Sequence, residues 1–207
     1  GLYLLGKRMF DMPTGAAASL VLLFSPLVWF YSLIAKPNIV DAPLVTWCAL
    51  LLWDVMRGNR RMILPAAILL GLAGGFRQQT LVFLAPLAVY AFRKLPFSRM
   101  LLGGGVTSLV FLASFVPMVI ATGGLAQYQP AMAGLQSSFF VHTSIFMGGG
   151  LGGLVSNVTK WVTFTGYALL LAAVLLGLWL LARLRQAPRA LRDERTWFIL
   201  FWALPSL

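Results

Sequence analysis

Two residues of opposite charge, Asp41 and Arg77, are the strongest candidates for chemistry in this sequence. Arg77 lies in the segment 74–80, between two apolar stretches that are each short for a membrane crossing. A guanidinium is permanently charged, so its placement near membrane depth is costly and indicates a functional site. Its fork of N–H donors matches the oxygens of a phosphate group. We therefore expect Arg77 to bind an anionic substrate; the alternative is that it pairs with a carbonyl or an acidic residue and only holds the two short segments together.

Asp41 is the candidate for a catalytic carboxylate. It comes just before an apolar segment that begins at Pro43, so its carboxylate could also cap the helix that starts there. The two roles are compatible, because a capping carboxylate is held rigidly and can still face a substrate. In a transfer reaction such a carboxylate would assist or orient an acceptor hydroxyl.

Three more polar residues are candidates for substrate binding. Gln78 adds amide donors and acceptors beside Arg77, and Lys36 follows an aromatic cluster. Lys36 either snorkels to the membrane interface or contacts a phosphate. His142, the only histidine, is either polar surface or a substrate contact. One histidine and one cysteine disfavour a protein-built transition-metal site, and participation of a divalent cation stays open.

The composition indicates that membrane helices must position these residues. The chain has 207 residues, of which 60% are hydrophobic and 10% charged, whereas a soluble domain has about a quarter charged residues. A net charge of +11 would suggest a nucleic-acid partner for a soluble chain. Here the orientation signal of membrane helices explains the charge, and we expect a lipid bilayer and no nucleic acid as partner. The single cysteine, Cys48, excludes an intramolecular disulfide.

The apolar pattern predicts an all-α fold, a polytopic transmembrane helix bundle in one domain over residues 1–207. Because the pattern runs past both ends, we expect the chain to be an internal fragment of a longer protein. The third and fourth spans are too short for a full crossing, so they form either short helices under a recessed surface or a re-entrant hairpin. The expected spans are 14–35, 43–56, 62–75, 80–92, 100–122, 159–184 and 196–207.

The segment 123–158 is more polar and is expected to be an outer loop with one or two interfacial helices. Within it, the glycine-rich run 148–153 is expected to be flexible. Of the 16 basic residues, 13 lie in the links on one side of the predicted bundle. The other three are Lys36, Arg77 and Lys160. Since short cytoplasmic loops are rich in lysine and arginine, the other side, with Asp41 and Arg77, should face outside or a lumen. Near the basic turn, Asp54 is expected to pair locally with Arg57 or Arg60.

Several segments carry a family resemblance. These are the sequence Ser-Pro-Leu-Val-Trp-Phe-Tyr at 25–31, the sequence Asp-Ala-Pro-Leu at 41–44, and the segment 71–87 around Arg77. They resemble the polytopic lipid-linked-sugar glycosyltransferases of the GT-C superfamily, including the family 39 type protein O-mannosyltransferases and the bacterial aminoarabinose transferases. The resemblance is best over residues 1–95.

The resemblance implies an enzyme that transfers a sugar from a polyprenyl-phosphate donor to a lipid, protein or glycan acceptor. It implies a bacterial inner-membrane location with the site facing the periplasm. Asp41 matches the family's second acidic position, and the principal catalytic acid is expected upstream of Gly1. A lysine often stands in the region of Arg77. Protein partners are not indicated. The residues alone leave two alternatives. One is a transporter or flippase for an anionic or polyprenyl-linked substrate, although no internal repeat supports it. The other is a non-catalytic membrane subunit.

Overall fold

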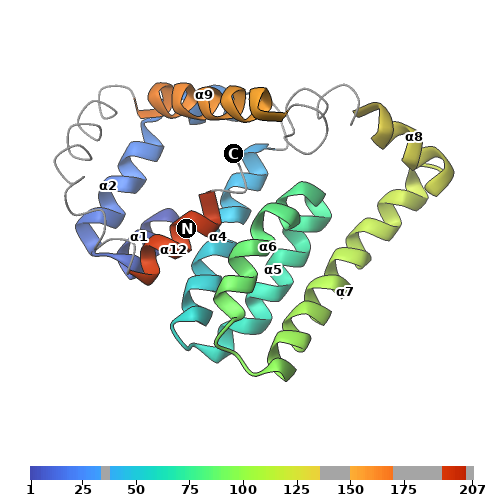
Figure 1. Ribbon diagram of the computed structural model, residues 1–207, viewed down its shortest axis with the longest axis horizontal. Helices are drawn as coiled ribbons and strands as arrows, with labels where there is room; N and C mark the ends of the chain where they lie inside the picture. Colours follow the sequence, from blue (N-terminus) through green and yellow to red (C-terminus); the bar gives the residue numbers. More distant parts are fainter. Residues whose placement is uncertain (34–37, 136–149, 170–192, 204–207) are drawn as a thin grey trace.

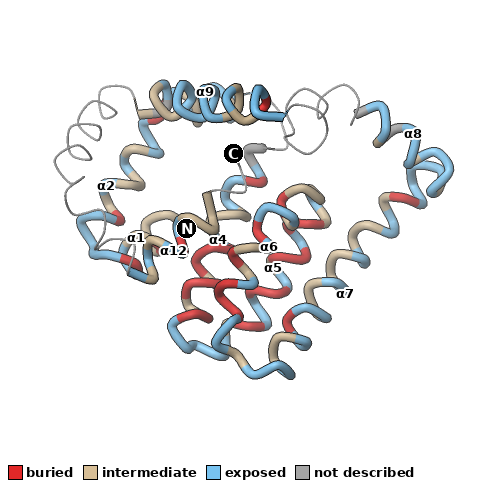
Figure 2. Tube along the Cα trace, viewed as in Figure 1, coloured by how far each residue is buried: buried red, intermediate tan, exposed pale blue. Residues whose placement is uncertain are grey.

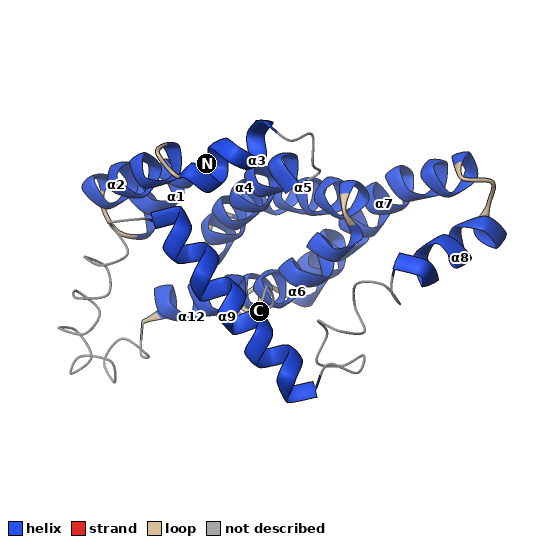
Figure 3. Ribbon diagram, turned by 90° about the horizontal axis from the view of Figure 1, so that it is seen from above, coloured by secondary structure: helices blue, strands red, loops and turns tan. Residues whose placement is uncertain are grey.

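A computed structural model describes residues 1–33, 38–135, 150–169 and 193–203, and every regular element in these ranges is a helix (Figure 3). The all-α prediction is therefore confirmed. The helices are α1 (Leu2–Met9), α2 (Met12–Leu23), α3 (Pro26–Leu33), α4 (Asn38–Met56), the 3₁₀ turn η1 (Arg60–Met62), α5 (Ile63–Phe76), α6 (Gln78–Phe92), α7 (Phe97–Ala121), α8 (Leu125–Leu135), α9 (Gly150–Leu169) and α12 (Glu194–Ala203).

The core lies among α4, α5, α6 and α12. Figure 2 shows the buried residues concentrated in the bundle formed by α4, α5 and α6. The α12 helix adds Phe198, which is fully buried and meets the ring of Trp53 edge to face at 5.0 Å between centroids. In lipid the tails are as apolar as leucine, so close van der Waals packing rather than water exclusion holds such helices together. The packing of this bundle positions the polar residues of α4 and α6.

Glycines on α5 let α7 approach closely. A Cβ atom added to Gly71 would lie 2.7 Å from both the backbone oxygen of Thr107 and the Cβ of Val110. A Cβ atom added to Gly75, one turn further along, would lie 2.4 Å from the Cβ of Ser114. The spacing of four residues is the small-residue pattern that brings two membrane helices into backbone contact. The α5–α7 contact thereby fixes the end of α5 that leads into Arg77.

Among the described helices, α7 is long and apolar enough to cross a membrane by itself. The pair α2 and α3 passes the same test when it is counted as one span, but the two helices are bent by 50°. The single span expected at 14–35 is therefore broken. Pro26 opens α3, and a proline removes a backbone donor and clashes with a continuing helix, which explains the break.

Two other local expectations were wrong. The α4 helix begins at Asn38, so Asp41 lies in its first turn instead of preceding it, and Pro43 lies inside the helix. The α9 helix begins at Gly150, so residues 150–153 are helical and not a flexible loop, while 148 and 149 lie outside the described residues. Glycine weakens a helix only by about 1 kcal/mol per residue, which neighbouring apolar residues can offset.

Asp54 has a different partner from the one expected. Its carboxylate pairs with the guanidinium of Arg8 on α1 instead of with a basic residue of the nearby turn. The two residues are 46 positions apart, and only the packing of α1 against α4 brings them together. A local sequence pattern carries no information about such a contact.

Candidate functional site

The site is built at the corner between α5 and α6, where Arg77 is the only residue that separates the two helices. Its backbone is extended, with φ −146° and ψ 109°, so it ends one helix and starts the next. The Arg77 N–H donates to the carbonyl of Ala73 at 2.9 Å, and its own carbonyl accepts from the N–H of Thr80 at 3.0 Å. The guanidinium is thus carried by a backbone corner that both helices fix.

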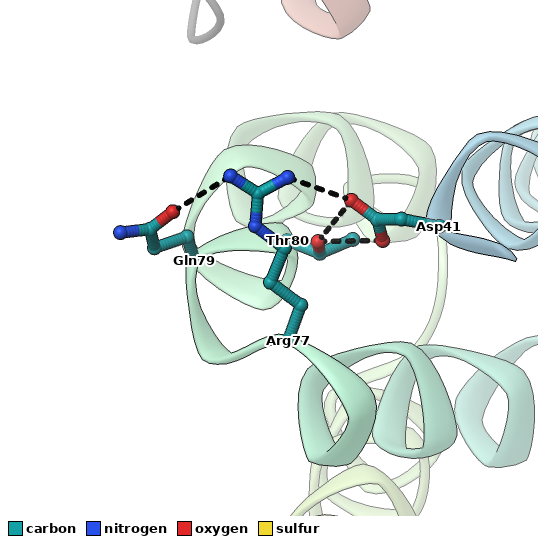
Figure 4. Close-up of polar contacts among 4 residues, drawn as sticks. All are labelled: Asp41, Arg77, Gln79 and Thr80. Carbon is teal, nitrogen blue, oxygen red and sulfur yellow. Dashed lines mark hydrogen bonds and ion pairs between the residues drawn. The ribbon is translucent and has the colours of Figure 1, made fainter. Parts of the chain in front are cut away.

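Asp41 reaches this corner from the first turn of α4. Its carboxylate accepts the hydroxyl hydrogen bond of Thr80, whose oxygen lies 2.7 Å and 2.9 Å from the two carboxylate oxygens (Figure 4). Only 12% of the Asp41 side chain is exposed. A buried carboxylate needs hydrogen-bonded or charged partners, and Thr80 is one of them.

Arg77 is the second partner of Asp41. Its Nη1 lies 3.4 Å from Oδ2 of Asp41, and its Nη2 donates to Oε1 of Gln79 at 3.0 Å (Figure 4). The two contacts hold the planar guanidinium from both sides. At the same time 38% of the Arg77 side chain is exposed. The arrangement therefore presents an oriented, partly accessible guanidinium beside a nearly buried carboxylate.

A further contact ties α8 to the same corner. The side-chain amide of Gln78 donates to the hydroxyl of Tyr128 at 2.5 Å. The ring of Tyr128 also meets Phe115 of α7 edge to face, with 5.6 Å between centroids. Gln78, which we expect to contact substrate, thus lies at the Arg77 corner and links it to α8.

The structure thus brings together three of the five expected site residues, namely Asp41, Arg77 and Gln78. The other two, Lys36 and His142, lie outside the described residues. Sequence reasoning missed Thr80 and Tyr128. Thr80 stands three positions after Arg77 as a lone hydroxyl at the start of an apolar helix, which was a usable signal. The sequence contains no such signal for Tyr128, because its partner Gln78 is 50 positions away.

The described residues contain no group of three or more His, Cys, Asp or Glu side chains close enough to hold a metal ion. In those ranges the charged chemistry at the Arg77 corner comes from one guanidinium and one carboxylate. An arginine of this kind can hold a phosphate or another oxyanion.

Residues 1–121 match the family model described as dolichyl-phosphate-mannose-protein mannosyltransferase. The match covers more than half of the chain and includes all of α1 to α7, with both Asp41 and Arg77. The chain belongs to this mannosyltransferase family. It is accordingly an integral membrane glycosyltransferase that takes its sugar from a polyprenyl-phosphate donor, as the resemblance to GT-C enzymes led us to expect. No curated protein and no solved structure matches the chain.

Proposed function

We propose that this glycosyltransferase holds the phosphate of its polyprenyl-linked donor at Arg77 and passes the sugar to a lipid, protein or glycan acceptor. The observation that carries the proposal is the partly exposed Arg77 guanidinium, fixed by Asp41 and Gln79 at the α5–α6 corner. Its fork geometry suits phosphate oxygens better than a single ammonium does. The description of the family makes polyprenyl-phosphate mannose the first donor to test.

In this reaction the bond between the sugar's anomeric carbon and the phosphate oxygen breaks, and a bond to the acceptor oxygen forms. Negative charge grows on the departing phosphate, and a preorganised cation such as Arg77 lowers the energy of that transition state. The acceptor hydroxyl must lose a proton to a base. Asp41 is already engaged by Thr80 and Arg77, so we assign it the orientation of Arg77. By analogy with the family, another carboxylate would take the proton.

The distribution of charge supports a site on the outer face. Figure 1 shows the α5–α6 corner at the opposite end of the bundle from the α4–α5 and α6–α7 links. Those two links carry a concentration of arginine and lysine residues, which favours a cytoplasmic location for them. We therefore propose that the Arg77 corner faces the periplasm of a bacterial inner membrane. The α8 helix, tied to the corner through Tyr128, would border the path of the acceptor.

The test is a transfer assay on the full natural protein in membranes, with a panel of radiolabelled polyprenyl-phosphate sugars. Arg77→Ala should abolish transfer while membrane insertion is retained, and Arg77→Lys should keep part of the activity because it retains the charge. Asp41→Asn should reduce activity by loosening Arg77. Lys160→Ala, a cation removed from the exposed surface of α9, is the matched control and should behave as wild type.

Full activity of Arg77→Ala would refute the proposed phosphate site. If no donor supports transfer and labelled lipid instead changes leaflet in an Arg77-dependent way, the protein is a flippase for a polyprenyl-linked substrate.

A further inference from the structure

The end of the bundle opposite Arg77 carries a dense group of cations that the transfer reaction does not use. They come from the α4–α5 and α6–α7 links, which lie side by side in Figure 1, and from the first turn of α7. Gly58 in the first link has φ +95°, which permits the tight turn that presents the arginines after it. We call this group the basic surface; it consists of Arg57, Arg60, Arg61, Arg93, Lys94 and Arg99.

The carboxylate of Glu194 lies near cations of both links. Glu194, at the start of α12, accepts a hydrogen bond from Lys94 and lies 3.5 Å from the guanidinium of Arg93. The hydrogen bond from Lys94 lowers the pKa of Glu194 below its ordinary value, and the positive charges of Lys94, Arg93 and Arg57 act in the same direction. Cations from both links are therefore close enough to act on one group.

The basic surface has a large excess of positive charge. Glu194 partners Arg93 and Lys94, and the nearby Asp54 pairs with Arg8 of α1. Across the described ranges, no ion pair engages Arg57, Arg60, Arg61 or Arg99. All of the surface's cations are exposed except Arg99, which is half-buried. Beside them Phe97 is 72% exposed, and an apolar side chain next to basic residues suits the boundary between the headgroups and acyl chains of a membrane.

We propose that the basic surface binds the phosphodiester headgroups of anionic phospholipids. Guanidinium groups form paired hydrogen bonds with phosphate oxygens. Basic segments next to a membrane helix are attracted to anionic lipid, and the surface sits at the end of α7, the helix able to cross the bilayer. This inference is independent of the donor site, because none of its residues lies at the Arg77 corner.

The experiment uses the full natural protein, purified in a neutral detergent, with phosphatidylglycerol or phosphatidylcholine of identical acyl chains added. Native mass spectrometry counts the lipids retained. Wild type should retain phosphatidylglycerol in preference to phosphatidylcholine. Arg60→Gln should weaken phosphatidylglycerol retention roughly fivefold, and the triple variant Arg57→Gln, Arg60→Gln, Arg61→Gln should weaken it further. Lys160→Gln, which removes one cation from α9, should leave retention unchanged.

A charge-preserving variant separates lipid binding from misfolding. Arg60→Lys, Arg61→Lys should retain most of the bound phosphatidylglycerol, because the positive charges stay in place. The proposal fails if both lipids are retained equally, or if Lys160→Gln weakens binding as much as Arg60→Gln. It also fails if inorganic phosphate alone displaces the lipid in full, because the surface would then be a site for free anions.

Discussion

The hydroxyl of Thr80 donates to the carboxylate of Asp41 and so joins the first turns of α6 and α4 across 39 positions of sequence. The contact is buried, and Arg77 approaches the same carboxylate from its more exposed side. Thr80 thus fixes Asp41, and Asp41 in turn helps to fix the guanidinium. The orientation of the guanidinium that we propose binds the phosphate therefore depends on a threonine that is itself buried.

We therefore expect Thr80→Val to lower transfer activity indirectly, through the positions of Asp41 and Arg77. Valine has the shape of threonine but cannot donate to Asp41, and a hydrogen bond to a charged group contributes about 1.5–3 kcal/mol. If all of that is expressed in the transition state, the rate falls about ten- to hundredfold. Initial rates at varied donor concentration measure the effect, and the loss should appear in kcat as well as in KM because Arg77 is misaligned during phosphate departure.

Two variants control for other causes of that loss. Thr80→Ser keeps the hydroxyl and should recover most of the activity. Thr46→Val removes an exposed hydroxyl that bonds only to the backbone of its own helix, at Ala42, and should be close to wild type. Equal activity of Thr80→Val and wild type would show that the Thr80 contact does not position Asp41 for the reaction.

How much of this site could be predicted from sequence depends on the kind of signal. Arg77 was identifiable because a charge between short apolar segments is rare, and the helical character of those segments followed from composition alone. The Asp54–Arg8 pair and the Gln78–Tyr128 bond were not identifiable. They join residues that are remote in sequence, and only the packing of whole helices determines which polar ends meet.

The prediction of the helix boundaries at Pro26 was wrong for a different reason. Pro26 was inside an expected span, yet it opens a separate helix bent by 50° from its predecessor. Hydrophobicity is continuous across that point, so a pattern based on composition predicts one span. The backbone chemistry of proline decides otherwise.

Gly71→Ala should destabilise the α5–α7 contact. The new methyl group would lie 2.7 Å from the backbone oxygen of Thr107 and from the Cβ of Val110. Backbone cannot move aside cheaply, so we expect a loss of about 1–3 kcal/mol in the free energy of unfolding. Gly104→Ala on α7 is the matched control, because an added Cβ there meets nothing within 4 Å. Denaturant unfolding of the purified protein compares them, and equal midpoints would contradict close packing at Gly71.

The attachment of α12 should weaken at acidic pH. The hydrogen bond from Lys94 lowers the pKa of Glu194 below its ordinary value of 4.5. A lowered folded-state pKa means that the contribution to stability is present above the ordinary pKa. That contribution is lost as the pH falls through the lowered value. The protection factors of the α12 amides, which correct the exchange rates for their intrinsic pH dependence, should fall over that window in wild type. Glu194→Gln should have lower protection factors already at neutral pH and show no further fall over that window; an unchanged pH response in this variant would assign the effect to another group.

We expect Tyr128→Phe to weaken binding of the acceptor more than binding of the donor. The substitution removes only the hydroxyl that accepts from Gln78, and it leaves the ring that packs on Phe115. A neutral hydrogen bond contributes about 0.5–1.5 kcal/mol, so α8 should sample positions away from the Arg77 corner more often. We expect KM for the acceptor to rise about two- to tenfold, with kcat at saturating acceptor nearly unchanged because Arg77 keeps its contacts. Tyr167→Phe on α9, where the side chain is exposed, is the control. A fall in kcat without a change in acceptor KM would mean that the Gln78–Tyr128 bond acts on Arg77 itself, and α8 would then serve the phosphate site instead of the acceptor path.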